Sequence, residues 1–156
     1  MSFDENWFPS DEETELGGIY FFSEGLDFKL VDEEQITSWL TTIIQHEKKT
    51  LHSLNIIFCT DQYLHQINVN YLNHDTLTDI ITFPYADPPI IKGELFISLE
   101  RIKENSNVFK AHFEQELYRV IAHGVLHLCG YGDKTDLEKQ QMRSKENEAL
   151  HLLQSL

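Results

Sequence analysis

Residues 107–128 read NVFKAHFEQELYRVIAHGVLHL, the longest apolar stretch in the sequence with helical spacing. A stripe of this kind is buried against other elements in a folded protein. Gly130 follows two residues later, and a glycine at this place is typical of a helix end. The sequence therefore predicts one long central helix with the other elements packed around it. The apolar stripe consists of Phe109, Phe113, Leu117, Val120 and Ile121.

Shorter patterns on both sides of this helix predict a mixed sheet. Strand-like runs lie near residues 19–22, 53–60, 78–85 and 93–102, and helical spacing recurs over 31–50, 61–73 and 135–156. The expected helix caps are Asp32, then Thr60 or Asp61, then Thr135 or Asp136. The order β-α-β-α-β-β-α-α predicts an α/β (or α+β) fold. We expect a single domain over residues 1–156, with helices packed on the sheet.

Length and cysteine usage suggest a cytoplasmic protein. The chain has 156 residues, which suits one core, and no apolar run approaches the roughly 20 residues that cross a bilayer. Its first residues are acidic and lack the basic and apolar parts of a secretory signal. Cys59 and Cys129 lie in apolar stretches, so we expect reduced core thiols; a bridge between them is the alternative.

The net charge is −14, which argues against a protein that coats nucleic acid without sequence preference. A local cleft can still bind phosphate, because a dication and a few arginines can dominate its field. Arg101, Lys103 and Lys110 form the best candidate for an RNA-facing patch, although a solvated surface is the favoured interpretation. Any contact with RNA is therefore expected to be local.

Two histidines on the central helix predict a metal site. His123 and His127 lie four residues apart, so both imidazoles face the same side of the helix. Gly130 can turn the chain back, and Asp133 then falls where a third ligand is needed. Three protein ligands with an open fourth position are typical of catalytic zinc, whose bound water ionises near pH 7. The alternative is a histidine pair that is merely packed or hydrogen-bonded.

The residue after the first histidine separates two chemistries. The spacing from His123 to Asp133 matches the metzincin peptidases, in which a glutamate follows the first histidine and acts as general base. Here that residue is Gly124. The absent carboxylate disfavours a zinc metallopeptidase and favours a substrate with its own charged group, such as a phosphodiester.

Other polar residues near the pair are weaker candidates. Arg119 lies one turn before His123 and is a candidate catalytic residue that would hold phosphate beside the metal. An ion pair with Glu116 is the favoured interpretation of Arg119. His74, in a predicted loop, is a candidate proton donor or RNA contact, or a solvated side chain. Asp79 is expected to orient the strand that follows it.

Three segments together resemble one known family. HGVLHLCGY (residues 123–131), INVNYLNHDTLTDIITFPY (67–85) and GELFIS (93–98) are similar in order and spacing to the YbeY-type rRNA maturation factors. These are bacterial metal-dependent endoribonucleases. The resemblance covers roughly the last two thirds of the chain, and the layout of a single short domain also fits.

The resemblance implies an α/β fold with a metal, usually taken as zinc, on the long helix. It also implies single-strand-specific endoribonuclease activity on rRNA, maturation of the 3′ end of small-subunit rRNA, and ribosome quality control in the cytoplasm. The family usually has a third histidine where this chain has Asp133. It usually has an arginine, which would grip phosphate, where this chain has Leu72.

Three hypotheses follow from these residues. In the first, His123, His127 and Asp133 hold Zn²⁺ or another divalent transition metal that activates hydroxide against a phosphodiester of single-stranded RNA. The second is a zinc metallopeptidase. The third is a non-catalytic factor associated with the small ribosomal subunit, which Leu72, Asp133 and the charge of −14 favour.

Overall fold

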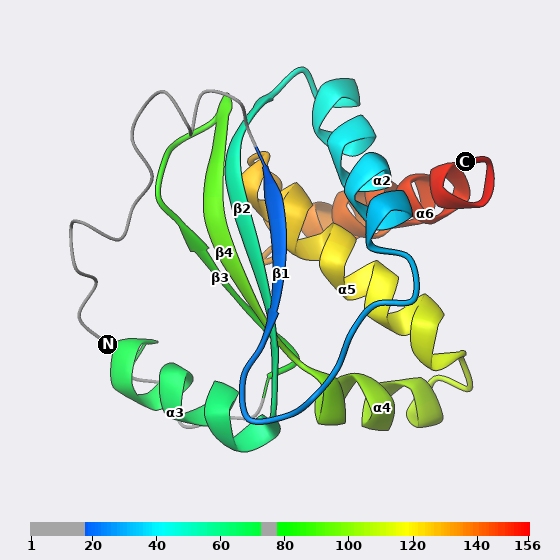
Figure 1. Cartoon of the computed structure of the whole chain (residues 1–156). Coiled ribbons are helices and arrows are strands. Elements are labelled where there is room, and N and C mark those ends of the chain that lie inside the picture. Colours follow the sequence, from blue (N-terminus) through cyan, green and yellow to red (C-terminus); the bar gives the residue numbers. More distant parts are fainter. Residues whose placement is uncertain (1–17, 73–77) are drawn as a thin grey trace.

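Four strands form one mixed sheet in the order β1-β2-β4-β3. The structure, a computed structural model, describes residues 18–72 and 78–156 (Figure 1). Strand β2 pairs in parallel with β1 and β4, whereas β3 runs antiparallel to β4 and forms one edge of the sheet. The mixed sheet agrees with the prediction. The strands are β1 (Ile19–Ser23), β2 (Thr50–Cys59), β3 (Ile80–Pro84) and β4 (Ile90–Ser98).

The helices cover the two faces of the sheet unequally. Helices α2 (Glu33–His46), α5 (Phe113–Leu128) and α6 (Asp136–Gln154) lie on one side, and α3 (Asp61–Leu72) lies on the other (Figure 1). Helix α4 (Leu99–Val108) follows β4 directly. Within the described residues, none of these helices is long and apolar enough to span a membrane.

Helix α5 packs against the sheet and contacts α2 and α6, as most of its apolar stripe predicts. Phe109 is the exception: it ends α4 and is exposed, so its predicted place in the stripe is wrong. Its buried residues join those of the sheet, α2 and α6 in one hydrophobic core. Trp39 of α2 is fully buried and donates from Nε1 to the carbonyl oxygen of Ala149 at 2.7 Å, which ties α2 to α6. A smaller cluster lies under α3 and includes Leu64, Ile67, Ile81 and Phe96. The histidine-bearing helix is thus held on several sides.

The predicted boundaries are wrong around residues 99–112. The sequence run 93–102 was expected to be a strand, but β4 ends at Ser98 and its last residue caps α4, accepting from the backbone N–H of Arg101 at 3.2 Å. The predicted long helix over 107–128 begins only at Phe113. Lys110 has a φ of 53°, which breaks the helical path between α4 and α5. The helical spacing of apolar residues continues across this turn, so the sequence pattern did not indicate that one helix ends and another begins here.

The predicted helix caps hold in each case. Asp32 accepts from the backbone N–H of Gln35 at 3.0 Å. Thr60, rather than Asp61, caps α3 by accepting from the N–H of Tyr63 at 3.1 Å. Thr135 forms a reciprocal capping box at the start of α6. These local bonds fix where α6 begins, close to the candidate site.

The two cysteines are free and buried, as the sequence predicts. Burial is the main cause that raises the pKa of Cys59 and of Cys129 to about 12. At pH 8 their thiolate fraction is then about 1,000-fold below that of an ordinary cysteine. We expect neither thiol to react with a disulfide reagent in native protein and both to react after unfolding in guanidinium. Rapid labelling of native protein, or no free thiol after unfolding, would contradict this.

Candidate metal centre

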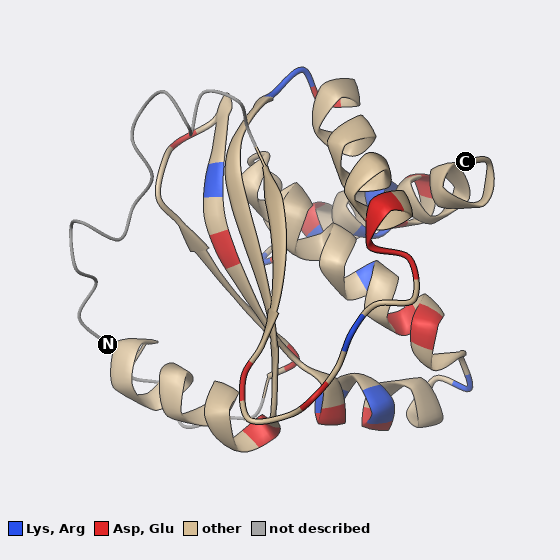
Figure 2. Ribbon diagram, viewed as in Figure 1, with Lys and Arg blue, Asp and Glu red and all other residues tan. Residues whose placement is uncertain are grey.

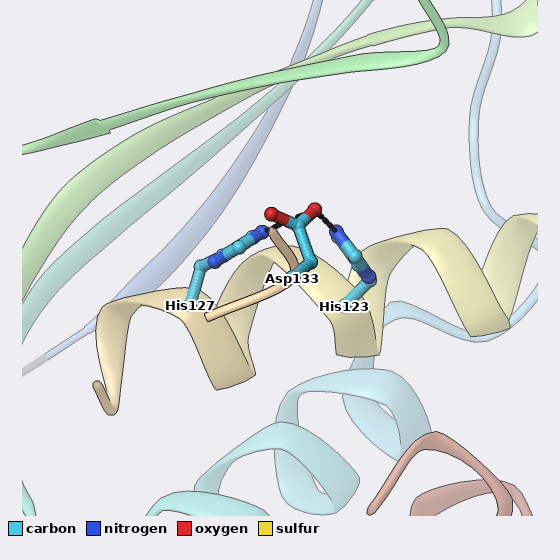
Figure 3. A group of neighbouring side chains, drawn as sticks. All are labelled: His123, His127 and Asp133. Atoms are coloured by element: carbon cyan, nitrogen blue, oxygen red, sulfur yellow. Dashed lines mark hydrogen bonds and ion pairs between the residues drawn. The ribbon is translucent and has the colours of Figure 1, made fainter. Parts of the chain in front are cut away.

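Helix α5 presents two imidazoles on one face. The ring centroids of His123 and His127 lie 4.5 Å apart with the ring planes at 85°. After the helix, Gly130 takes a φ of +112°, and the N–H of Tyr131 donates to the carbonyl oxygen of Leu126 at 3.1 Å. This turn returns the chain over the helix. Figure 3 shows Asp133 between the two rings, with its carboxylate directed at both.

The three side chains converge on one point. Oδ2 of Asp133 lies 3.2 Å from Nε2 of His127 and 3.4 Å from Nε2 of His123. One ligand atom from each residue lies within 4.8 Å of both others. Zinc bonds of about 2.0–2.2 Å place neighbouring donors of a tetrahedron about 3.3–3.6 Å apart. The nitrogen and oxygen atoms present therefore fit one small dication.

The other nitrogen of each ring is held by protein. Nδ1 of His123 lies 2.7 Å from Oε2 of Glu146, and Nδ1 of His127 lies 2.8 Å from the carbonyl oxygen of Tyr131. Both partners are acceptors, so each Nδ1 donates. A histidine that binds a metal through Nε2 carries its proton on Nδ1, and the contacts at Nδ1 favour that form of both rings.

A pocket of about 520 Å³ opens beside the three residues. It lies between α5, the edge strand β3 and the end of α3. Leu72, where the resemblance implies an arginine in other members, lines the same pocket as His123 and His127. Among the described lining residues, the formal charges are the carboxylates of Asp79 and Asp133, with neither Lys nor Arg. An anionic substrate would be repelled here without a bound cation.

Burial and neighbouring charges shift the pKa values of His123, Glu146 and Asp79. Burial lowers the pKa of His123, but the hydrogen bond and charge of Glu146 outweigh it, so the pKa is raised. Burial likewise raises the pKa of Glu146, but its bonds to His123 and Arg119 bring the pKa below its usual value. Burial raises the pKa of Asp79 in the pocket wall. The carboxylate beside His123 is therefore kept ionised.

Arg119 lies behind the histidine pair. Its Nη1 lies 3.1 Å from Oε1 of Glu146, and its Nη2 donates to Oδ1 of Asn147 at 2.9 Å. The ion-pair interpretation of Arg119 thus holds, but the expected partner Glu116 is wrong. Arg119 is not among the described residues that line the pocket. Arg119 therefore pairs with the carboxylate that contacts His123. The predicted contact of Arg119 with phosphate stays a prediction.

Two site residues were missed by sequence reasoning. Glu146 lies 23 residues beyond His123, on an amphipathic helix whose charged residues look solvated in the sequence. Its side chain is only 8% exposed. Asp79 was expected to have a structural role, yet it faces the pocket. No local spacing in the sequence marks either one.

Position 124 has no room for the glutamate of the peptidase pattern. A Cβ atom built on Gly124 would lie 2.8 Å from Cδ1 of Ile80 and 2.8 Å from Cδ2 of Leu95. Gly124 therefore faces the sheet and lets α5 approach it closely. The absence of a general base here reflects the packing of the helix, which further disfavours the peptidase hypothesis.

Comparison with known proteins decides the family. The family model described as endoribonuclease YbeY matches residues 23–154. The chain belongs to the YbeY family. A relative named endoribonuclease YbeY from Flavobacterium johnsoniae is 50% identical over 83% of this chain and 93% of its own length. A second, from Amoebophilus asiaticus, is 52% identical over 83% of this chain and 88% of its own.

The fold of this YbeY-family chain is similar to that of a solved structure. The solution structure of TM1509 from Thermotoga maritima matches with a TM-score of 0.65 and 28% identity, over 87% of this chain and 89% of that one. The resemblance seen in the sequence is thus confirmed. Asp133 and Leu72, the two positions at which the resemblance implies other residues, both line the pocket.

The remaining RNA-contact candidates are less informative. Arg101 pairs with Asp61 at 3.0 Å, so the candidate patch has one of its three charges neutralised. Figure 2 shows acidic positions beside the basic ones on α4, which is typical of a solvated surface. His74 lies outside the described residues.

Proposed function

We propose that this YbeY-family protein is a metal-dependent endoribonuclease that cuts single-stranded RNA. The observation that supports this most directly is the convergence of His123, His127 and Asp133 on one point beside an open pocket. The relatives named endoribonuclease YbeY supply the reaction class: hydrolysis of a phosphodiester inside an RNA chain.

The charge of the pocket supports a metal requirement. A phosphodiester approaching Asp79 and Asp133 meets two carboxylates, and Glu146 lies behind them. A bound zinc ion, or another divalent transition metal, would supply Lewis-acid chemistry: a more acidic water and positive charge beside the phosphoryl oxygens. His123 and His127 would hold the ion through Nε2, and Asp133 through a carboxylate oxygen. The identity of the metal is part of the proposal.

The pocket also supports a preference for single strands. Its volume of about 520 Å³ suits a nucleotide-sized group rather than a duplex. Nucleotides of a single strand can leave the stack and enter such a pocket, whereas those of an A-form duplex cannot without unpairing. Leu72 contributes an apolar wall, against which a base or ribose can pack.

We also propose a cellular role, which membership of the family supports. We propose the 3′ end of small-subunit rRNA as the substrate, in ribosome maturation and quality control. This makes the small ribosomal subunit the partner and the cytoplasm the location. The chain's charge of −14 suggests that its own surface contributes little to RNA affinity, so that the metal and the subunit position the substrate.

The test is cleavage of matched RNA substrates by purified protein. We expect cutting of a labelled single-stranded RNA carrying the small-subunit 3′ sequence, little cutting of the same sequence in a duplex, loss with a chelator and recovery with zinc. An Asp133→Ala protein prepared in parallel controls for contaminating nuclease. Equal cutting by the two preparations would remove the support for this site.

The rival functions give different results in the same samples. Cutting of a peptide library that is lost with chelator would favour the peptidase hypothesis. Binding to small subunits in co-sedimentation, with RNA left intact by metal-loaded protein, would favour the non-catalytic factor. Either result would overturn the proposal.

A further inference from the structure

The supports of both histidines meet on helix α6. Lys145 and Glu146 are neighbours in the chain, and each belongs to a different set of contacts. Glu146 contacts His123 directly. Lys145 belongs to the contacts that hold Tyr131, whose carbonyl oxygen contacts His127. One turn of α6 is therefore connected to both imidazoles.

The contacts of Glu146 form the first arm. Oε2 lies 2.7 Å from Nδ1 of His123, while Oε1 lies 3.1 Å from Nη1 of Arg119 and 3.6 Å from Nη1 of Arg143. The side chain is 8% exposed, so its orientation is restricted by packing as well as by charge. A buried carboxylate held on one oxygen by cations offers the other oxygen in a fixed direction.

The contacts of Tyr131 form the second arm. Its Oη donates to Oε1 of Glu47 at 2.6 Å, and Nζ of Lys145 lies 3.2 Å from Oε2 of the same carboxylate. The Lys145 ammonium also lies 5.7 Å from the centre of the Tyr131 ring. Glu47 is the C-cap of α2, so this arm joins three parts of the fold. It fixes the backbone whose carbonyl oxygen accepts from His127.

We propose that α6 positions the two metal-binding histidines. Glu146 acts through Nδ1 of His123. Lys145 and Glu47 act through Tyr131, whose carbonyl oxygen contacts Nδ1 of His127. This inference rests on the histidine pair of the proposed function and assigns positioning residues to it. The two arms hold both rings with Nε2 directed at the pocket. They also choose the Nδ1–H form of each neutral ring, which a metal site needs.

The first measurement determines which ring nitrogen of His123 is protonated in protein without metal. Two-bond proton–nitrogen spectra of metal-free protein, recorded over a pH titration that reaches the neutral ring of His123, report which nitrogen carries the proton. We expect the Nδ1–H form of His123 in wild type and a large Nε2–H fraction in Glu146→Met, which has no acceptor. Glu146→Gln keeps an acceptor oxygen and is expected to restore part of the Nδ1–H form.

The second measurement is zinc affinity, by competition with a coloured chelator. Loss of an outer partner of a metal-binding histidine typically costs about 10–100-fold in metal affinity. We expect a loss in this range for Glu146→Met and a smaller one for Glu146→Gln. Glu104→Gln is the matched control, because it removes the same charge from an exposed position of α4 that belongs to neither set of contacts. It should change affinity less than about twofold.

The second arm is tested by Tyr131→Phe, which removes only the hydroxyl that Glu47 accepts from. The carbonyl oxygen remains, so we expect a loss of about threefold, below that of a direct partner. Glu47→Gln should resemble it. Thermal unfolding of each variant shows whether the fold is kept. Unchanged zinc affinity in Tyr131→Phe would overturn this arm.

The outcomes separate this inference from the proposed function. If folded Glu146→Met matches Glu104→Gln in both ring spectra and zinc affinity, the positioning role is wrong. If wild type binds no zinc but Glu146→Met still changes the His123 proton position, the metal function fails and the positioning role stands.

Discussion

Replacing His127 with alanine is expected to reduce bound zinc to background and RNA cleavage by at least about 1,000-fold. The change leaves two of the three proposed ligands. These are the imidazole of His123, which Glu146 holds through Nδ1, and the carboxylate of Asp133, whose side chain is 40% exposed. Two ligands do not hold a catalytic dication well enough to compete with water. Elemental analysis of the purified protein and single-turnover cleavage of a labelled RNA measure the two effects.

The matched control for this substitution is His151→Ala. His151 is an exposed residue of α6, so the same atoms are removed at a place that does not face the pocket. We expect wild-type zinc content and cleavage. Because Ala fits a helix well, the fold of both variants should persist, which circular dichroism checks. Stoichiometric zinc in His127→Ala would refute the assignment of the three ligands.

Replacing Gly124 with glutamate is expected to lower the free energy of unfolding by more than about 3 kcal/mol. The Cβ atom alone would come within 2.8 Å of Ile80 and Leu95 side chains. Leu95 is fully buried, so there is little free space into which it can move. The carboxylate would then be buried without a partner or would push α5 away from the sheet.

Denaturant unfolding of Gly124→Glu measures the loss, and Gln115→Glu controls for the added charge. Gln115 is exposed on the same helix, so that variant should lie within about 0.5 kcal/mol of wild type. Gly124→Ala should cost about 1 kcal/mol, because better helix propensity offsets part of the overpacking. A Gly124→Glu protein as stable as Gln115→Glu would show that position 124 has room for the side chain and would refute this packing argument.

The convergence of the three proposed metal ligands was predictable because they are close in the chain. His123 and His127 are one turn apart, and the turn at Gly130 brings Asp133 back within six residues of the second histidine. Helix periodicity and a glycine at a helix end decide such geometry locally. The error around residues 99–112 is also local: apolar spacing continued across a break that Lys110 makes by its backbone conformation.

The sequence by itself determined the elements that carry the ligands, the spacing of the two imidazoles and the place of the carboxylate, since each depends on contacts within a few turns. Only the tertiary structure decided what holds those ligands. Glu146 reaches His123 from 23 residues away, and Glu47 reaches Tyr131 from 84 residues away. Such contacts depend on how α2 and α6 pack against α5, and the charge pattern of an amphipathic helix does not show which acidic residue turns inward.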